Sequence, residues 1–379
     1  MGIVETVLNG SSIQLQKQDI KADIDTIFKK SEIIKANARK EVVCSEPLIL
    51  REGNGIFYPN TINIIQGKSG THKSRLVEVL ISCILSNESY DHFLGFSYEG
   101  NNQINCILAD TERNLKEQLP LAIQNIKKLT NTPIQEDLQQ FEPVSLIHIK
   151  RNERFKILRI LLDDLRNKTD HHLFIILDVV TDCVSNFNDP KSSLELIDLM
   201  NEYINEFDVT FLCVIHENPS SSDKARGHLG TELMNKASTV LKIGIEKEHD
   251  IIKLEFLKCR RSERFKNIYL FFSKENERLE IAEVEMVKDI EKNKQRKAPI
   301  KEVKKALLEF LSNGTKSKKE VLEKLTHHFN CGNRTIEDRL KEIENGVFEN
   351  TKGEKLELSK ENHGREIYMN LKKSKIINP

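Results

Sequence analysis

Short apolar runs alternate with longer amphipathic segments across the middle of the chain. The runs are rich in Ile, Val and Leu and are continuous, which indicates strands buried on both faces. The segments between them have apolar residues at helical spacing. Strand–helix alternation predicts an α/β fold, with a parallel sheet between two layers of helices. The predicted strands are 62–66, 104–109, 144–149, 173–177 and 210–215, and the predicted helices are 74–87, 113–129, 153–167 and 191–206.

The segments on either side follow other patterns. Residues 18–37 have isoleucines at helical spacing among charges, which predicts an amphipathic helix. Three strand-like runs at 239–245, 251–257 and 268–272 follow the core without long helices between them, and predict a meander at the sheet edge. The charged stretch 274–300 predicts a linker.

After the linker the pattern predicts a small α+β domain. Helical spacing recurs at 301–312, 317–326 and 333–345, and strand-like pieces follow at 355–358 and 366–371. Three helices followed by two strands around a glycine turn are the order of a winged helix. We therefore expect an N-terminal helical segment, a sheet-based core, a charged linker and a winged-helix-like domain, at 1–40, 41–287, 288–300 and 301–379.

Composition narrows the class of protein. The chain has 379 residues, of which 31% are charged, and no apolar run reaches the ~18 residues of a membrane-spanning helix. We expect a cytoplasmic protein that does not contact membranes. Seven cysteines lie far apart without a C-x-x-C pair, which favours buried thiols over a disulfide frame or a zinc site.

The net charge of zero hides an asymmetry. Residues 288–379 carry 22 Lys and Arg against 15 Asp and Glu, whereas residues 1–287 carry 36 against 43. A basic tail beside an acidic body is typical of a segment that meets polyanions. A solvated tail without a partner is the alternative.

A glycine-containing loop joins the strand 62–66 to the following helix. It reads Gly67-Lys68-Ser69-Gly70-Thr71-His72-Lys73-Ser74, and Arg75 follows. Backbone N–H groups of such a loop can surround phosphate oxygens beside a helix N-terminus. Lys73 can reach the β- and γ-phosphates of ATP, and the Ser74 hydroxyl can ligate Mg²⁺. We predict a P-loop that binds ATP through residues 67–75.

His72 departs from the usual P-loop pattern, which has glycine directly before the lysine. Glycine is favoured there because the backbone approaches the nucleotide closely. The His72 side chain must point away, or contact phosphate or a neighbouring subunit. A chance glycine–lysine turn is the alternative to a P-loop.

Two carboxylates follow apolar strands downstream of this loop. Asp178 ends the strand 173–177 at the sheet edge where ligands bind, and can hold the Mg²⁺ shell. Asp182 is a weaker candidate, and an aspartate that only forms a turn is the alternative. Glu112 follows the strand 104–109 and can orient and deprotonate an attacking water. The alternative for Glu112 is an acid that favours the dipole of the next helix.

The order of P-loop, Asp110-Thr111-Glu112 and Asp178 resembles the RecA-like ATPase core. The resemblance covers roughly residues 41–287 and implies that Glu112 is the catalytic base. It also implies that His216, at the end of the strand 210–215, senses the γ-phosphate. Asn218 is the second candidate for that role, and a structural histidine is the alternative.

Two later segments extend the resemblance. The glycine-containing loop at 226–231, with Arg226 and His228, resembles loops that face the central channel and touch DNA; an ordinary surface loop is the alternative. Lys258 and Arg260 are similar to the K-x-R element of DnaB-like and RepA-like hexameric helicases. That element reaches into the next subunit and stabilises charge on the transferred phosphoryl group. It implies a homo-oligomer, in this group a hexamer.

The third C-terminal helix, 333–345, is the candidate DNA-binding helix. Arg334 and Lys341 lie on it, and Arg365 lies in the predicted wing. Acidic residues share the helix and would repel phosphate, and winged helices also dock proteins. DNA binding is the favoured hypothesis, with protein docking as the alternative.

These features predict an oligomeric, Mg²⁺-dependent ATPase acting on DNA, similar to a replicative helicase of a plasmid, phage or mobile element. It would use ATP and move along or remodel single-stranded DNA in a ring channel, with duplex DNA at the C-terminal domain. The second hypothesis is a nucleotide-gated DNA-binding regulator or loader with slow or no hydrolysis. The third is a filament-forming recombinase, although residues 1–40 contain no obvious polymerisation motif.

Overall fold

The chain divides into two compact units in the computed structural model. The first comprises Met1–Gly244 and Leu254–Asn267, and the second Ile245–Lys253 and Ile268–Pro379. The predicted boundary at residue 287 lies outside the described residues. Those residues are 24–86, 88, 90–100, 103–218, 224–246, 251–263, 265–283, 298–312, 314–344, 347–349, 355–363 and 366–373.

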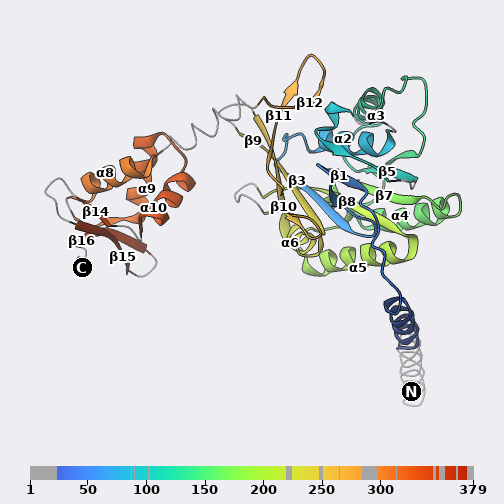
Figure 1. Cartoon of the computed structure of the whole chain (residues 1–379), viewed down its shortest axis with the longest axis horizontal. Helices are drawn as coiled ribbons and strands as arrows, with labels where there is room; N and C mark the ends of the chain where they lie inside the picture. Colours follow the sequence, from blue (N-terminus) through green and yellow to red (C-terminus); the bar gives the residue numbers. More distant parts are fainter. Residues whose placement is uncertain are drawn as a thin grey trace, which may run out of the picture. The chain divides into compact units, whose positions relative to one another are not determined.

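A largely parallel sheet forms the core of the chain (Figure 1), and all of its parallel pairing lies between strands of the first unit, whereas its strands β11 and β12 belong to the second. The strand order is β12-β11-β10-β9-β3-β8-β7-β5-β6, and the strands from β9 to β6 pair in parallel. The predicted α/β class, a parallel sheet with helices on both faces, is confirmed. The parallel strands are β3 (Ile62–Gly67), β5 (Ile104–Asp110), β6 (Phe141–Ser145), β7 (His172–Asp178), β8 (Val209–His216) and β9 (Thr239–Glu246).

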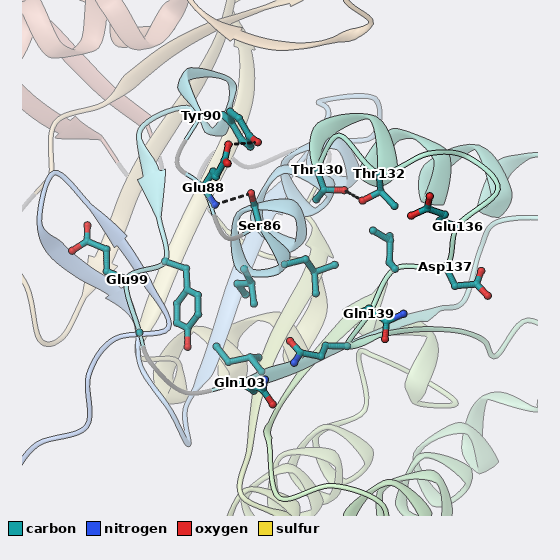
Figure 2. Close-up of a pocket in the computed structure, with 17 residues that line it drawn as sticks. Ser86, Glu88, Tyr90, Glu99, Gln103, Thr130, Thr132, Glu136, Asp137 and Gln139 are labelled. Atoms are coloured by element: carbon teal, nitrogen blue, oxygen red, sulfur yellow. Dashed lines mark hydrogen bonds between the residues drawn. The ribbon is translucent and has the colours of Figure 1, made fainter.

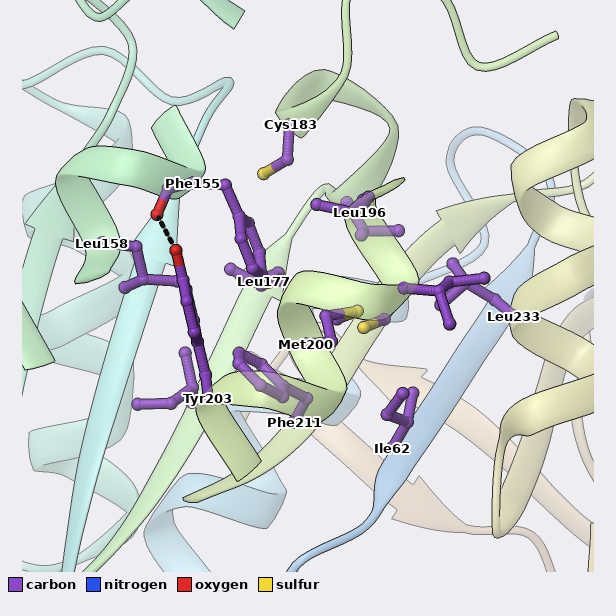
Figure 3. Packing of buried hydrophobic residues seen from close by; sticks show 14 of the residues in the cluster. Ile62, Phe155, Leu158, Leu177, Cys183, Leu196, Met200, Tyr203, Phe211 and Leu233 are labelled. Atoms are coloured by element: carbon purple, nitrogen blue, oxygen red, sulfur yellow. Dashed lines mark hydrogen bonds between the residues drawn. The ribbon is translucent and has the colours of Figure 1, made fainter. Parts of the chain in front are cut away.

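Helices cover both faces of this sheet, with α2 and α3 on one face and α4, α5 and α6 on the other (Figure 1). Between the second group and the sheet, Phe155 and Tyr203 stack with ring centroids 5.1 Å apart, and the Tyr203 hydroxyl donates to the Phe155 carbonyl (Figure 3). Their burial anchors α4 against α5. The helices are α2 (Lys73–Leu85), α3 (Gln118–Leu129), α4 (Arg151–Arg166), α5 (Pro190–Phe207) and α6 (Gly227–Lys236).

Local sequence explains where several elements begin. The Asp189 side chain accepts a hydrogen bond from the Ser192 backbone N–H at 2.8 Å, and Pro190 occupies the first position of α5. In α3 the start is later than predicted, at Gln118 rather than residue 113. The residues before it form a turn instead, because side chains there bind backbone N–H groups and compete with helix formation.

The sheet edge beyond β9 differs from the prediction in two places. The predicted meander begins too early, because β9 pairs in parallel with β3 after the crossover helix α6. The predicted linker also begins too early, because Arg278–Ile281 forms β12 and pairs antiparallel with β11. The added strands are β10 (Ile251–Cys259), β11 (Ile268–Ser273) and β12 (Arg278–Ile281).

Smaller elements complete the first unit. Residues 24–38 are helical, and leave large apolar side chains on the surface. A separate three-stranded sheet has the order β2-β1-β4. Its strands and two short 3₁₀ helices are β1 (Ile49–Arg51), β2 (Asn54–Phe57), β4 (Phe96–Ser97), η1 (Asp91–Phe93) and η2 (Val180–Cys183).

The second unit contains the small α+β domain expected from the sequence. Its helices pack around Val303, Leu325 and Leu340, and its antiparallel sheet has the order β13-β16-β15-β14. The Ser317 hydroxyl and the Glu320 carboxylate form a reciprocal capping box that starts α9. The elements are α8 (Ile300–Phe310), β13 (Lys316–Ser317), α9 (Lys318–Phe329), α10 (Asn333–Glu344), β14 (Val347–Glu349), β15 (Lys355–His363) and β16 (Glu366–Lys373).

Candidate active site

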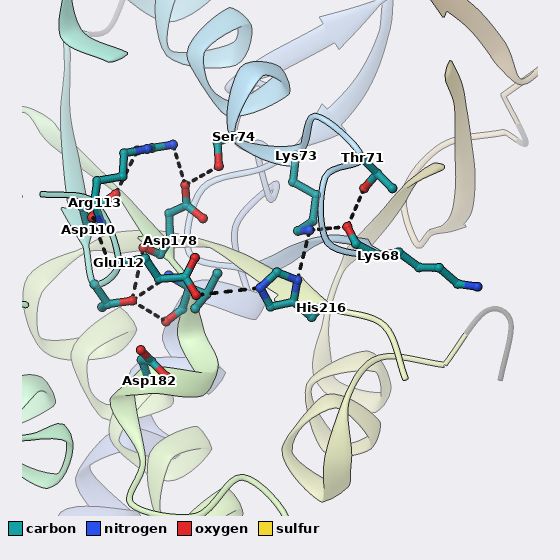
Figure 4. A network of polar contacts seen from close by, with 12 residues as sticks. Lys68, Thr71, Lys73, Ser74, Asp110, Glu112, Arg113, Asp178, Asp182 and His216 are labelled. Atoms are coloured by element: carbon teal, nitrogen blue, oxygen red, sulfur yellow. Dashed lines mark hydrogen bonds and ion pairs between the residues drawn. The ribbon is translucent and has the colours of Figure 1, made fainter. Parts of the chain in front are cut away.

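Four segments distant in sequence meet at the carboxyl edge of the parallel strands (Figure 4). They are the loop between β3 and α2 and the ends of β5, β7 and β8. Each of these strands is largely buried along its length, and the polar residues that follow its apolar run emerge at this edge. The sheet therefore brings together most of the residues predicted to bind and hydrolyse ATP.

The loop holds its lysine against its own backbone. The Lys73 Nζ donates to the Lys68 carbonyl at 2.7 Å, and the Thr71 hydroxyl donates to the same carbonyl at 2.8 Å. Burial lowers the pKa of Lys73, while nearby carboxylates raise it. By contrast, the Lys68 and Ser69 residues are exposed. A Cβ at Gly67 would collide with the Ile243 backbone oxygen, so the strand end requires glycine.

His72 and Gly70 have left-handed backbone conformations. The φ angle is +65° at His72 and +75° at Gly70. Close approach of the nucleotide is one reason why P-loops usually have glycine at the position of His72. The structure adds a second reason, because a positive φ angle favours glycine. The His72 side chain is half-buried, as is that of Arg75.

The predicted metal ligands Ser74 and Asp178 are in contact. The Ser74 hydroxyl donates to Asp178 Oδ2 at 2.8 Å. Burial raises the pKa of Asp178, and the nearby Arg113 opposes that increase. The weaker candidate, Asp182, is instead paired with Arg151 at 3.0 Å. This geometry favours Asp178 over Asp182 as the metal-binding carboxylate.

A basic residue that the sequence analysis did not single out lies inside this cluster. Arg113 Nη1 donates to Asp110 Oδ2 at 2.8 Å, and its Nη2 donates to Asp178 Oδ2 at 2.9 Å. The available signal was that two predicted strands both end in aspartate, because a cation nearby stabilises two carboxylates buried side by side.

Glu112 and His216 form a second set of contacts with the loop lysine. The Lys73 ammonium donates to His216 Nδ1 at 3.2 Å. Because an ammonium only donates, the ring proton is assigned to Nε2, which lies 3.8 Å from Glu112 Oε1. This contact with His216 is the main cause that lowers the pKa of Glu112, against the effect of partial burial. Glu112 is therefore ionised near neutral pH and half-exposed, as a base that meets water must be.

Behind the loop, α2 contributes a buried acid that the sequence analysis also missed. Burial raises the pKa of Glu78 to about 7, and the nearby Arg113 and Arg75 oppose the increase. The Asn125 amide donates to Glu78 Oε2 at 3.2 Å. The sequence signal for Glu78 was its position as a single acid among the apolar residues that form the buried face of α2.

Residues 226–231 were predicted to form a loop that contacts DNA. The prediction of a loop is wrong, because α6 begins at Gly227. Gly227 has φ +72°, and a Cβ there would meet Phe187 and Asn188. Arg226 precedes the helix and is exposed, with its guanidinium 4.9 Å from the centre of the Phe187 ring. His228 is half-buried in the first turn of the helix. The glycines therefore serve a tight helix start rather than a mobile loop.

The K-x-R pair binds the end of α6 in its own chain. The Lys258 Nζ donates to the Met234 carbonyl at 2.8 Å, and Arg260 Nη2 donates to the Asn235 carbonyl at 2.8 Å. These carbonyls lack helical partners, so the two cations satisfy the helix C-terminus. The hydrogen bonds found for Lys258 and Arg260 thus lie away from the phosphate loop of the same chain.

The predicted DNA-binding residues of the second unit lie on α10. Arg334 and Lys341 are exposed. Glu337, between them, forms an ion pair of 3.0 Å with Lys318, which lowers the pKa of Glu337. That pairing neutralises one of the acids expected to repel phosphate. Arg365 lies outside the described residues.

A cavity of about 870 Å³ lies at the amino end of β5, away from the loop 67–75 (Figure 2). It is lined by the ends of α2 and α3 and by acids such as Glu88, Glu136 and Asp137. Negative charge there opposes binding of a phosphorylated ligand. The candidate ATP site is therefore the polar cluster of Figure 4 rather than this cavity.

The donor set of the cluster fits Mg²⁺ that arrives with a nucleotide. Among the described residues, no group of three His, Cys, Asp or Glu side chains is placed to hold a metal ion. Mg²⁺ commonly uses one or two protein oxygens together with substrate phosphates and water. Ser74 and Asp178 supply such oxygens, beside a lysine suited to phosphate.

No protein-family model and no curated protein match the chain. Among solved structures, the crystal structure of the RadB recombinase is similar to it, with 12% identity, a TM-score of 0.42, and coverage of 61% of this chain and 94% of that chain. Separately, within the described part of the chain, no helix is both long and apolar enough to cross a bilayer.

Proposed function

We propose that the protein is an oligomeric, Mg²⁺-dependent ATPase that acts on DNA, in the manner of RecA-like motors. The observation that carries this proposal is one set of contacts at the sheet edge. Ser74 contacts Asp178, and Lys73 contacts His216, which faces Glu112. A phosphate-binding cation, a metal-binding pair and a candidate base thus lie within one site.

Binding of ATP would use the loop 67–75. Lys73 would exchange its bond to the Lys68 carbonyl for the β- and γ-phosphates, and backbone N–H groups at the start of α2 would face the phosphates. Mg²⁺, when bound through Ser74 and Asp178, would neutralise charge that develops on the phosphates. Asp178 is buried, so its charge acts with little screening by water.

Hydrolysis would use Glu112 and His216. Glu112 takes a proton from the attacking water as the water oxygen bonds to the γ-phosphorus, and the bond from that phosphorus to the bridging oxygen breaks, leaving ADP. His216 contacts both Lys73 and Glu112, so it can register a γ-phosphate that draws Lys73 away. Loss of that bond would free Nδ1 and change how Nε2 holds Glu112.

Self-association is part of this proposal. The helix at 24–38 leaves Ile27 63% exposed and Phe28 66% exposed, and Ile33 and Ile34 are exposed to a similar extent. An apolar helix surface of this kind is stable when a second protein surface covers it, and we propose a second copy of the chain. In a hexameric ring, Lys258 and Arg260 would reach the neighbouring site.

The second unit is proposed to be a winged helix that binds DNA through α10. The support is the exposure of Arg334 and Lys341 on one helix and the ion pair that neutralises Glu337. Phosphate contacts by Lys and Arg supply affinity without sequence specificity. Single-stranded DNA in the ring channel, contacted by Arg226 and His228, is the second proposed contact.

The test is ATP turnover by the full chain, measured against protein concentration with and without single-stranded DNA. We expect DNA to stimulate turnover, and specific activity to rise steeply with concentration because sites are completed between subunits. The Lys73→Ala variant should lose turnover. If turnover is strictly proportional to protein concentration, Lys258 and Arg260 do not act on the site of a neighbouring subunit. Absence of Mg²⁺-dependent turnover would overturn the enzymatic proposal.

A second candidate function is favoured by His72. A histidine at φ +65° in the phosphate loop is a departure that fits a nucleotide-gated regulator or loader, which binds ATP and hydrolyses it slowly or not at all. Unwinding of a forked DNA duplex by the isolated protein would exclude this candidate. ATP-dependent oligomerisation without turnover would favour it.

A further inference from the structure

Two buried aspartates lie side by side in the sheet. The parallel register of β5 and β7 places Asp110 opposite Asp178. The side chain of Asp110 is 1% exposed and that of Asp178 is 5% exposed. Two carboxylates that are adjacent and buried repel each other strongly, because little water screens their charges. A cation between them stabilises the ionised form of both.

Arg113 is that cation. One nitrogen of its guanidinium binds Asp110 at 2.8 Å, and the other binds Asp178 at 2.9 Å. The Arg113 side chain is only 15% exposed, so the bridge itself is protected from solvent. A planar guanidinium can bind two acceptors at fixed angles, whereas an ammonium acts as a single point of charge.

The bridge reaches the metal-binding pair. The Asp178 oxygen that accepts from Arg113 is Oδ2, and the same oxygen accepts from the Ser74 hydroxyl. Arg113 therefore fixes the rotation of the Asp178 carboxylate and keeps it directed toward Ser74. It also leaves the three charged groups with a net charge of −1, which is available to a dication.

The bridge also reaches the proposed base. Asp110 Oδ1 accepts from the backbone N–H of Glu112 at 3.1 Å and from that of Arg113 at 2.7 Å. These bonds hold the turn that carries Glu112. One arginine thus ties the turn of the base to the carboxylate of the metal site.

We propose that Arg113 is a positioning residue for the metal site, which aligns Asp178 with Ser74 and sets the Glu112 turn relative to them. The inference rests on the proposed function, since it concerns the Mg²⁺–ATP site described above. Within the part of the chain that the structure describes, the Arg113 side chain donates to Asp110 and Asp178 rather than to the loop 67–75. Its effect passes through Asp178 and Asp110, as the effect of a carboxylate behind a metal ligand does in other metal sites.

The experiment compares the variants Arg113→Gln and Arg113→Lys with the full-length wild type. Arg151→Gln is the matched control, because Arg151 also pairs with a nearby aspartate, Asp182, but bridges no second carboxylate in the site. Three quantities are measured. They are the affinity for a fluorescent ATP analogue in EDTA, the affinity of the nucleotide complex for Mn²⁺ by electron paramagnetic resonance, and kcat and KM for ATP with Mg²⁺.

We expect Arg113→Gln to weaken Mn²⁺ binding roughly tenfold and to lower kcat roughly 10- to 100-fold. Nucleotide affinity in EDTA should stay close to that of wild type, because Lys73 and the loop are untouched. Arg113→Lys should restore part of the Mn²⁺ affinity relative to Arg113→Gln, because an ammonium can still hold one carboxylate in place, but not all of it, because it cannot bridge the two. Arg151→Gln should behave as wild type.

Wild-type Mn²⁺ affinity in a folded Arg113→Gln protein would overturn the inference. Should that variant fail to fold, Arg113→Lys decides, and wild-type Mn²⁺ affinity and kcat in it would overturn the bridging role. Failure of the proposed function has a different signature: the wild-type protein itself would then show no metal-dependent nucleotide binding.

Discussion

Charged residues are used in opposite ways in the two units of the chain. At the carboxyl edge of the sheet, Asp110 and Asp178 are almost completely buried, and each binds Arg113, which is largely buried. On α10 of the second unit, Arg334 and Lys341 are exposed to solvent. Burial makes an unpaired charge costly, so each buried group has a defined partner and a defined direction. Exposed charges carry no such requirement.

The two regions differ in how closely the positions of their charged groups restrict what those groups can do. In the buried cluster the partners restrict the possible roles, because only some arrangements satisfy every charge. On α10 the exposed cations are compatible with any polyanion, and the proposal for DNA rests on their sign and placement. Substitutions should therefore have large and specific effects in the first unit, and smaller and more uniform effects in the second.

The largest effect is expected from Glu112→Gln. Removing the base should lower kcat for ATP roughly 10²- to 10⁴-fold, with little change in nucleotide affinity. Steady-state turnover and binding of a fluorescent ATP analogue would measure both quantities. Glu117→Gln is the matched control, because Glu117 is an exposed acid five residues further along. A Glu112→Gln enzyme that retains turnover would remove Glu112 from the mechanism.

The next effect is on stability and depends on pH. The pKa of Glu78 is raised to about 7 in the folded protein, so the folded state holds a proton that the unfolded state releases at lower pH. Stability from this group is full below the ordinary glutamate pKa and is lost as pH rises through about 7. The total loss is about 3 kcal/mol.

Glu78→Gln should remove this loss. Its free energy of unfolding should resemble that of wild type at pH 4.5 and exceed it by up to about 3 kcal/mol at pH 8. Denaturant unfolding at several pH values would measure the difference. Glu136→Gln, at an exposed acid, is the control. Identical pH dependence in wild type and Glu78→Gln would contradict the buried and perturbed carboxyl described for α2.

On α10 the expected effects are smaller and less specific. Arg334→Ala and Lys341→Ala should each weaken DNA binding several-fold and equally for different sequences. Each should also reduce the slope of log affinity against log salt by about 0.9, if one phosphate contact is lost. Fluorescence anisotropy at several salt concentrations would measure this. Lys305→Ala, on the exposed side of α8, is the control, and unchanged slopes would exclude α10 as the DNA-binding surface.

The smallest effect is expected from His72→Gly. Glycine relieves the cost of a left-handed residue, roughly 1–2 kcal/mol, but adds flexibility to the unfolded chain that costs about 0.5–1 kcal/mol. The free energy of unfolding should therefore rise by less than about 1 kcal/mol. Glu52→Gly, at φ +51° outside the loop, should give a similar gain without touching the site. A decrease in stability at position 72 alone would indicate that the His72 side chain makes contacts worth more than the strain.

Much of the core could be predicted from local pattern. Continuous apolar runs predicted β3, β5, β7 and β8, because a strand buried on both faces tolerates few polar residues. The strand predicted at 144–149 is displaced, because β6 runs from Phe141 to Ser145 and is only partly buried, so its sequence does not form a continuous apolar run. The same rule located Asp178 and His216, since the first polar residue after such a run emerges at the sheet edge. The start of α6 was mistaken for a loop, because glycines that allow a tight turn also resemble those of a flexible segment.

By itself, the sequence determined the α/β class, the glycine-containing loop before α2 and the two carboxylates after apolar strands, because those signals lie in contiguous residues. Only the tertiary structure decided that Arg113 bridges Asp110 and Asp178, that Lys73 contacts His216, and that Lys258 and Arg260 bind the end of α6. These contacts depend on strand register and on which helix end lies beside which strand. They join residues far apart in the sequence, so the packing of the whole sheet decides them and the sequence around any one residue does not.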